Sequence, residues 1–111
     1  MKKLKALASI LLLASPSFVL AEFDGNYLYQ GYKDYNREYN SYDAFGYMGF
    51  VRGVTAMLII DKKICVDDNF AFSQAFDTVG EYYKTHPKSR TIAPVLPVVL
   101  ALTHEFPCPA N

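Results

Sequence analysis

The chain contains two cysteines, Cys65 and Cys108, and the segment between them has the pattern of a helical hairpin. Apolar side chains in its first half recur at steps of four, three and four, which places them on one helix face. They are Phe72, Phe76, Val79 and Tyr83. Pro87 ends this helix because proline has no N–H to donate, and a second apolar run, residues 95–106, leads back to Cys108. The cysteines therefore lie together at the open end of an αα-hairpin, which predicts a disulfide between them.

Polar residues mark the two ends of this hairpin. Asp67, Asp68 and Asn69 are predicted to cap the first helix, where acidic side chains also suit the helix dipole. The polar run at residues 86–90 is the predicted connecting turn. In the chain-entropy model, a disulfide around a loop of this size stabilises the fold by about 4 kcal/mol. That is a large share of the stability of a small domain.

Residues 1–21 have the pattern of a secretory signal peptide. Three lysines precede the apolar run 6–13, and a small-x-small motif ends at Ala21. Cleavage is therefore predicted between Ala21 and Glu22, and the apolar run is too short and too broken for an uncleaved membrane anchor. The mature chain, residues 22–111, is predicted to be a single helical domain that is exported to an oxidising compartment, which permits the disulfide.

Composition excludes several classes of function. The chain has eleven basic and eleven acidic residues, and loss of three N-terminal lysines leaves eight against eleven, a net charge of −3. This charge gives no electrostatic footprint for nucleic acid. The sequence has no Gly-rich phosphate loop, calcium loop, pair of catalytic carboxylates or nucleophile elbow. We therefore expect no enzyme activity and no cofactor.

The two histidines, His86 and His104, and the two cysteines are the candidate metal ligands. His104 and Cys108 are four residues apart and could lie on one helix face. A tetrahedral zinc site would need all four side chains, whereas export favours oxidation of the cysteines to a disulfide. The sequence therefore predicts no metal site and an exposed position for His86 in the turn.

The N-terminal half of the mature chain is rich in tyrosine. It begins with a polar stretch, residues 22–31, that two glycines interrupt and that predicts a loose arm. Four tyrosines spaced by three, four and three residues would then form one stripe on a helix. They are Tyr32, Tyr35, Tyr39 and Tyr42. Such a stripe either packs in the core or at a dimer contact, or it binds a partner, since tyrosine is enriched at interfaces.

Residues 45–60 are the most apolar part of the mature chain and predict the central core helix. Its predicted buried face carries Tyr47, Val51, Val54 and Leu58. Gly49 and Gly53 lie one turn apart and predict close approach of another backbone, because each costs about 1 kcal/mol in a helix relative to alanine. Arg52 and the short length argue against a transmembrane span, so no membrane contact is expected after signal cleavage.

These patterns together predict an all-α fold, a small bundle of about four helices with one disulfide that closes an αα-hairpin. The tyrosine stripe adds more exposed apolar surface than a small monomer usually carries. A homodimer is therefore predicted, with either the tyrosine stripe or the face of Gly49 and Gly53 at the contact.

Several short motifs occur in a defined order between residues 45 and 108. They are Gly49 to Ala56 (GFVRGVTA), Cys65-Val66-Asp67, Ser73-Gln74, Tyr82-Tyr83, His86-Pro87 and Phe106-Pro107-Cys108. This ordered set, behind a signal peptide, resembles the Rap1a/Tai family of immunity proteins. Two features differ from many relatives. Tyrosines replace a further cysteine pair in the N-terminal half, and Ala71 stands where relatives often have a helix-capping Thr or Ser.

The resemblance implies a small, all-helical, exported bacterial protein, often dimeric, with a disulfide at positions like Cys65 and Cys108. Characterised members of the family neutralise peptidoglycan amidase effectors that type VI secretion delivers. The resemblance therefore implies a periplasmic immunity protein that blocks such an amidase by occluding its active site. The alternative is a periplasmic stress or client-binding protein, in which the tyrosine-rich segment covers an apolar surface and releases it.

Three groups of residues are candidates for contact with a partner. The first is the turn, because Pro87 stiffens it and the disulfide fixes its two flanking helices at their other end. Its members are His86, Lys88 and Arg90, of which the two cations offer charge-assisted hydrogen bonds. The other candidates are the acidic pair Asp67 and Asp68 and the tyrosines Tyr32, Tyr35 and Tyr39. A solvated turn without a special role is the competing interpretation of residues 86–90.

Overall fold

The structure, a computed structural model, describes residues 24–110, and this range is helical without a β-strand. Its elements are α2 (Gly25–Asn36), α3 (Tyr42–Ile60), α4 (Phe72–Thr85), the 3₁₀ helix η1 (Pro87–Thr91) and α5 (Val95–Glu105). The predicted all-α bundle of about four helices is confirmed. The predicted signal peptide and its cleavage site between Ala21 and Glu22 lie outside the described residues.

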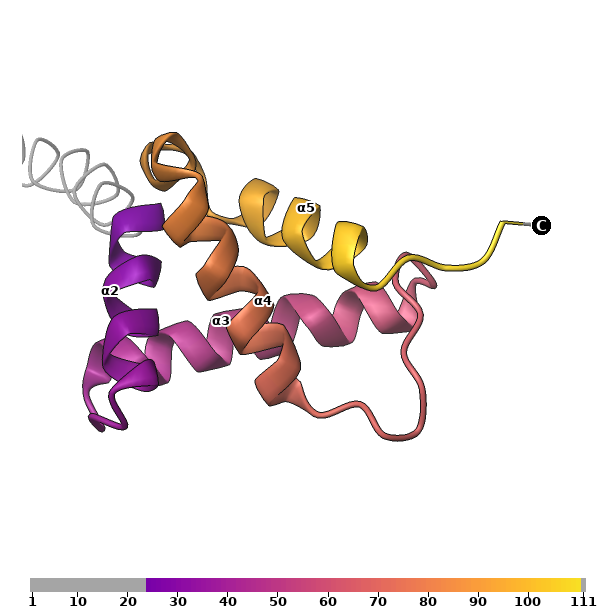
Figure 1. The fold of residues 1–111 in the computed structure, drawn as a ribbon, viewed down its shortest axis with the longest axis horizontal. Coiled ribbons are helices and arrows are strands. Elements are labelled where there is room, and N and C mark those ends of the chain that lie inside the picture. The colour runs from indigo at the N-terminus through magenta and orange to yellow at the C-terminus, as the bar shows by residue number, and fades with distance from the viewer. Residues whose placement is uncertain (1–23, 111) are drawn as a thin grey trace, which may run out of the picture.

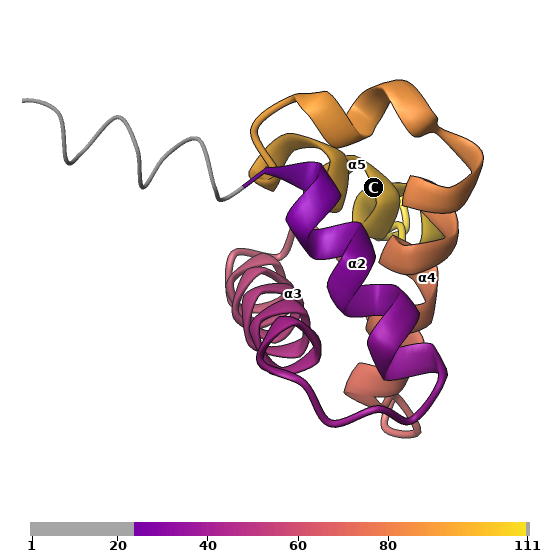
Figure 2. The same cartoon turned by 90° about the vertical axis from the view of Figure 1, so that its left-hand side faces the viewer.

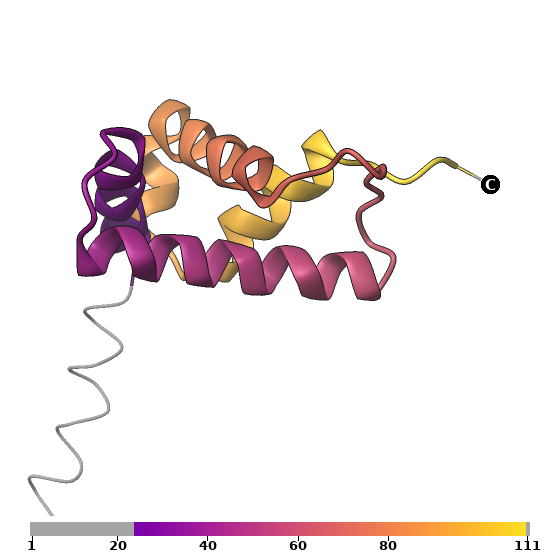
Figure 3. The same ribbon diagram turned by 90° about the horizontal axis from the view of Figure 1, so that it is seen from below.

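The longest of these helices, α3, forms the base on which the others pack (Figure 1). Within the described range, α2, α4 and α5 all lie on one side of α3 (Figure 3). Viewed from the end where α2 lies, α3 and α4 flank α2 (Figure 2), and α2 contacts both of them. This arrangement buries one face of α3 and leaves the opposite face without a covering helix among residues 24–110.

α2 begins at Gly25, so the predicted loose arm over residues 22–31 was wrong for the part that the structure describes. The Asp24 side chain caps the helix by accepting a hydrogen bond from a backbone N–H of the first turn at 3.1 Å. Gly31 does not break the helix but permits contact, because a Cβ there would collide with the Asp43 carbonyl oxygen of α3. The glycines that predicted a loop thus allow close packing.

The connection between α2 and α3 interrupts the predicted tyrosine stripe, so the prediction of one continuous helix face was also wrong. α2 ends at Asn36, and Glu38 has a φ of 60°, a left-handed conformation that turns the chain away from the helix. Ser41 then caps α3 by accepting a hydrogen bond from the Ala44 N–H at 3.0 Å. A new helix therefore starts where the spacing predicted a continuing one.

α3 has 19 residues, and by length and composition it could cross a membrane, so the sequence argument from short length was wrong. In the structure it is the central helix and contacts α2, α4 and α5. Tyr47 and Val51 are fully buried, as predicted, but only 22% of the most apolar window of α3 is buried. Gly49 and Gly53 have open space at the position of a Cβ. The predicted close approach of another backbone to them does not occur within the described chain.

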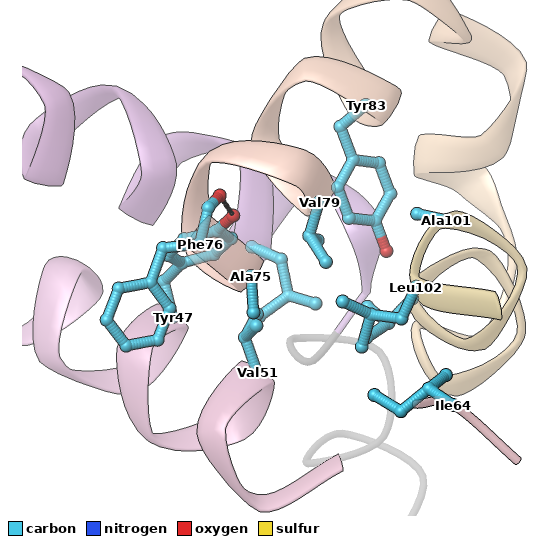
Figure 4. Packing of buried hydrophobic residues seen from close by; sticks show 11 residues of the cluster. Tyr47, Val51, Ile64, Ala75, Phe76, Val79, Tyr83, Ala101 and Leu102 are labelled. Atoms are coloured by element: carbon cyan, nitrogen blue, oxygen red, sulfur yellow. Dashed lines mark hydrogen bonds between the residues drawn. The ribbon is translucent and has the colours of Figure 1, made fainter. Parts of the chain in front are cut away.

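The core lies where α3, α4 and α5 meet (Figure 4). Its largest fully buried side chains are Tyr47 and Tyr83. The Tyr47 hydroxyl donates a hydrogen bond to the Phe76 carbonyl of α4. The Tyr83 hydroxyl points toward Ala101 of α5 (Figure 4) and has no hydrogen-bond partner among the described residues. Burial raises the pKa of Tyr83 to about 12 and also raises the pKa of Tyr47, so both phenols are neutral near pH 7.

α4 and α5 form the predicted helical hairpin, with η1 as its turn. Cys65 and Cys108 are joined by a disulfide, with their Cα atoms 4.8 Å apart. The Cys65 N–H also donates a hydrogen bond to the Phe106 carbonyl at 3.0 Å. The disulfide therefore connects the loop before α4 to the segment after α5, and the predicted closure of the hairpin is confirmed.

The start of α4 differs from the prediction. α4 begins at Phe72, so residues 67–69 do not cap it. They form a separate turn, in which the Asp67 side chain accepts a hydrogen bond from the Asn69 N–H at 3.0 Å. The N-cap position is occupied by Ala71, whose side chain has no acceptor, and the helix starts without the usual side-chain cap.

We expect Ala71→Ser to stabilise the protein by about 1 kcal/mol. Ala71 already has the extended backbone of an N-cap residue, and the Gln74 side chain accepts a hydrogen bond from the Ala71 N–H at 3.1 Å. A serine hydroxyl would accept from the Gln74 N–H and complete the capping box. Urea denaturation measures the change, with Ala71→Val as a control that enlarges the side chain without an acceptor. Equal midpoints for Ala71→Ser and wild type would contradict the prediction.

Candidate functional site

The turn candidate Arg90 is largely engaged in holding the fold. Its Nε donates a hydrogen bond to the Tyr83 carbonyl at 2.9 Å, and its Nη2 donates to the Lys84 carbonyl at 3.3 Å. These bonds satisfy acceptors at the C-terminal end of α4. The guanidinium also lies 3.9 Å from the ring centroid of Tyr29 on α2. Arg90 therefore ties η1 to α4 and α2, and its removal would test folding as well as binding.

The other two turn candidates differ in how far the fold engages them. The His86 ring stacks on Tyr82 with the ring centroids 4.0 Å apart, and its Nδ1 lies 3.0 Å from the Tyr82 carbonyl oxygen. Lys88 is exposed on η1. A substitution of Lys88 therefore leaves the hydrogen bonds at the end of α4 in place, whereas substitutions of His86 and Arg90 do not.

The tyrosine candidates lie in two different environments. Tyr32 and Tyr35 are half-buried on α2, with ring centroids 5.7 Å and 6.4 Å from that of Tyr47. The Tyr32 ring occupies the space that Gly80 of α4 leaves open. Tyr39 lies in the loop after α2 and is 61% exposed. The structure therefore does not bring these three tyrosines together on one exposed surface.

The acidic candidates lie away from the turn. Asp67 and Asp68 are exposed in the loop between α3 and α4, just after the disulfide. This loop follows the end of α3 that is far from α2 (Figure 3), whereas η1 packs against α2. The acidic pair thus lies apart from the turn, whereas the turn adjoins α2, which carries Tyr32 and Tyr35.

Asp34 is a buried carboxylate at the connection between α2 and α3, and it is 5% exposed. Its Oδ1 accepts hydrogen bonds from Gln30 at 3.1 Å and from Arg37, and its Oδ2 accepts from the Ser41 hydroxyl at 2.7 Å. The hydrogen bond from Ser41, followed by that from Arg37, lowers the pKa of Asp34. The ionised carboxylate therefore holds the end of α2 against the N-cap of α3.

We expect the stabilisation that ionised Asp34 gives to the fold to be lost in acid. Because its folded-state pKa lies below the unfolded value of about 3.9, ionised Asp34 stabilises the fold above that value, and this contribution is lost as the pH falls through the folded pKa. Urea midpoints of the wild type should therefore fall between about pH 5 and pH 2 more steeply than those of Asp34→Asn. Asp68→Asn, in an exposed loop, is the matched control. Equal slopes for wild type and Asp34→Asn would refute this role.

A groove of about 500 Å³ lies between α4 and α5. Three carboxylates line it, those of Asp77, Glu81 and Glu105, and we name it the acidic groove. The other lining residues are Thr78, Tyr82, Thr85, His86, Ala101 and His104. The side that α4 contributes is a single helix face, because Asp77, Glu81 and Thr85 recur every four residues and Thr78 and Tyr82 lie beside them.

A second groove, of about 440 Å³, lies between α2 and the C-terminal end of α4. It combines cations, tyrosine rings and side-chain amides, and we name it the basic tyrosine groove. Its lining residues are Tyr29, Gln30, Tyr32, Lys33, Asn36, Arg37 and Lys84. Burial of the ring, and then the nearby carboxylates of Glu81 and Asp77, raise the pKa of Tyr32. Asp77 and Glu81 of the acidic groove therefore also lie near Tyr32, at the border between the two grooves.

Neither groove was among the sequence predictions. The spacing of Tyr29, Lys33 and Asn36 by four and three residues did place them on one helix face. However, Lys84 is far from them in the sequence, and only the packing of α2 on α4 brings it into the same groove. The spacing signal was present, but its meaning depended on tertiary structure.

Metal ligation is a further possibility that the sequence raised. Within residues 24–110, no group of three or more His, Cys, Asp and Glu side chains is placed to hold a metal ion. Cys65 and Cys108 are bonded to each other, whereas His86 and His104 line the acidic groove. The four side chains considered for zinc therefore do not converge.

The geometry defines a class of protein, a small disulfide-closed helical scaffold with two charged grooves on its surface. Residues 24–108 match the family described as Rap1a immunity proteins. The chain therefore belongs to the Rap1a immunity protein family, which confirms the resemblance seen over residues 45–108 and extends it to α2. Neither a curated protein nor a solved structure matches the chain.

Proposed function

We propose that this protein is a periplasmic immunity protein of type VI secretion, which binds a peptidoglycan amidase effector and occludes its active site. The observation that carries the proposal is the family match from α2 to Cys108. The signal-peptide pattern of residues 1–21 supports a periplasmic location. The disulfide supports an oxidising compartment as well. The protein itself would then be an inhibitor and not an enzyme.

A protein that blocks an enzyme needs a rigid, shaped surface and no chemistry of its own. The disulfide, the Arg90 contacts and the Asp34 hydrogen bonds fix the connections at both ends of the helices. Such restraint lowers the entropy lost on binding. The turn at residues 86–90 could enter the active-site cleft of an enzyme, and the two grooves could receive side chains from the rim of that cleft.

The test uses a candidate peptidoglycan hydrolase, sought among the genes next to this one and purified together with the mature, oxidised protein. We expect an equimolar amount of the protein to abolish release of stem peptides from peptidoglycan, and the complex to run as one peak in gel filtration. The matched control is the same chain after reduction, alkylation and unfolding. A hydrolase that neither binds nor loses activity would overturn the proposal, and binding of unfolded proteins instead would favour the client-binding alternative.

The proposal includes a homodimer formed through the uncovered face of α3. Exposed apolar side chains follow this face, and they are Tyr42, Phe45, Met57 and Ile60. Between them Gly49 and Gly53 are open to a neighbouring backbone. Contiguous exposed apolar surface of this kind is typical of an interaction site, and a face that is flat at its centre can pair with its own copy around a two-fold axis. Of the tyrosine stripe, Tyr42 lies on this face of α3, whereas Tyr32 and Tyr35 are half-buried on α2, which favours the α3 face over the stripe as the contact.

Gly49→Leu with Gly53→Leu tests this contact. Leucine favours helix over glycine, so the monomer should be at least as stable as the wild type, while the two side chains would hold the partner helix away. We expect light scattering to give a dimer mass for the wild type and a monomer mass for the double variant. A control, Ser73→Leu on the exposed side of α4, should remain dimeric. A monomeric wild type would refute the homodimer without affecting the proposed inhibition.

A further inference from the structure

We propose that the basic tyrosine groove is the docking site for an acidic segment of the effector, with the carboxylates of that segment between Lys33 of α2 and Lys84 of α4. This inference rests on the proposed function for the existence of the effector. It adds the place on this chain and the chemistry of the partner.

Positive charge is concentrated at this groove although the chain as a whole is not basic. The chain has eleven Lys and Arg residues, of which three precede residue 22, so eight remain in the mature chain. Three of these eight line the groove, and Arg90 adjoins it by stacking on Tyr29. Half of the cations of an acidic mature chain therefore lie around one groove. Such a local field attracts carboxylates and orients an approaching partner.

The two lysines of the groove form no ion pair in the described chain. The ion pair that the structure contains among residues 24–110 joins Arg37 to Asp34. Lys33 and Lys84 are exposed, and the Lys33 Nζ lies 5.2 Å from the ring centroid of Tyr29. An acidic segment would supply the charges that the fold leaves out.

The groove offers hydrogen-bond donors on well-fixed elements. Ammonium groups, a guanidinium, the Asn36 amide and two phenols can all donate to a carboxylate. The Tyr32 ring is held in the space above Gly80, and Arg90 is bonded to two carbonyls of α4. The volume of about 440 Å³ is that of a site for several side chains and not for a single small anion.

The acidic groove between α4 and α5 would not take the same segment. Asp77, Glu81 and Glu105 line that groove and would repel carboxylates. A partner with an acidic protrusion is therefore disfavoured at the acidic groove. Nucleic acid, the other large polyanion, is disfavoured by the net charge of −3 of the mature chain.

The first arm of the test compares two double charge reversals in binding to the candidate hydrolase. Lys33→Glu with Lys84→Glu changes the groove, whereas Lys62→Glu with Lys63→Glu makes the same change in charge at the far end of α3. We expect the groove variant to bind at least about tenfold more weakly, with a shallower dependence of affinity on salt, and the control to stay within about twofold. Equal losses in both variants, or no loss in either, would overturn the inference.

Folding is checked by circular dichroism, and Lys33→Gln with Lys84→Gln replaces the groove variant if that variant does not fold. The expected result is then a smaller loss in the same direction. Unchanged affinity in this neutral variant would also overturn the inference.

The second arm does not require the effector. The ¹⁵N-labelled protein is titrated with an acetylated Asp-Glu-Asp-Glu amide and, separately, with inorganic phosphate at matched ionic strength. We expect the peptide to shift amide signals of α2 and the end of α4 in the wild type and not in the groove variant. Saturation by phosphate without a response to the peptide would overturn the inference. If the hydrolase does not bind the wild type, the proposed function fails, and this arm still decides whether the groove takes acidic peptide.

Discussion

Replacing both cysteines, Cys65→Ala with Cys108→Ala, is expected to lower the free energy of unfolding by about 4 kcal/mol. The two residues are 43 positions apart, and the closed loop contains α4, η1 and α5. Opening it returns conformational freedom to the unfolded chain. A loss of this size is a large share of the 5–15 kcal/mol, roughly, that stabilises a small domain. The folded contacts that remain include the hydrogen bond from the Cys65 N–H to the Phe106 carbonyl.

Urea denaturation followed at the helical circular dichroism band measures this loss. Reduction of the wild type should reproduce the effect of the double variant, while the reductant should leave the double variant unchanged. The unfolded state without the bond is more extended, so the urea dependence of the unfolding free energy should also steepen. If the free energies of unfolding of the oxidised and reduced wild type differed by less than about 1 kcal/mol, the disulfide would not stabilise the hairpin as predicted.

The hairpin and its disulfide could be predicted from sequence because they depend on local signals. Helical spacing, a proline in the turn and two cysteines at matching ends determine which segments meet. The same local reasoning failed for α2. Gly25 and Gly31 indicated a loop, but Gly25 packs against the backbone of Arg90 and Gly31 against α3. A glycine that permits contact and a glycine that ends a helix look identical in a single sequence.

The end of α2 illustrates a second limit of prediction from the sequence. The tyrosine spacing is compatible with one helix through position 42, yet Ser41 starts a new helix and Glu38 turns the chain. What decides between these outcomes is the carboxylate of Asp34, which the structure buries and surrounds with donors. Its donors Gln30, Arg37 and Ser41 lie within seven positions of Asp34, so the signal was local, but the spacing of the tyrosines alone did not contain it.

The candidate site was predicted less well than the fold, for a related reason. The turn at residues 86–90 was found from its polarity, but polarity did not show that Arg90 is engaged with the carbonyls of α4. The basic tyrosine groove draws Lys33 from α2 and Lys84 from α4, which only tertiary packing brings together. Surfaces assembled from separate helices carry no contiguous signal in the sequence.

Gly31→Ala is expected to lower the free energy of unfolding by about 2–3 kcal/mol, the largest effect that a single methyl group should have in this chain. A Cβ at Gly31 would meet the Asp43 carbonyl oxygen and the Cβ of Tyr47. Both atoms are fixed by the backbone of α3, so neither can rotate away. α2 would therefore have to move away from the core. No glycine of the described chain has a positive φ, so the loss would reflect packing and not backbone conformation.

Three other glycines supply matched controls for the contact between α2 and α3 at Gly31. Gly49→Ala and Gly53→Ala place the same methyl group in open space on a helix, so each should stabilise the monomer by up to about 1 kcal/mol. At Gly80 the obstacle is the half-buried ring of Tyr32, a side chain and not the backbone of a neighbouring helix, so Gly80→Ala should cost less than Gly31→Ala and lie between these extremes. Urea midpoints measured at the lowest usable protein concentration should therefore rank Gly31→Ala below Gly80→Ala, and both below the α3 variants. If Gly31→Ala ranked with Gly49→Ala, the close contact of α2 with α3 would be disproved. The tyrosines of α2 would then need another explanation for their burial.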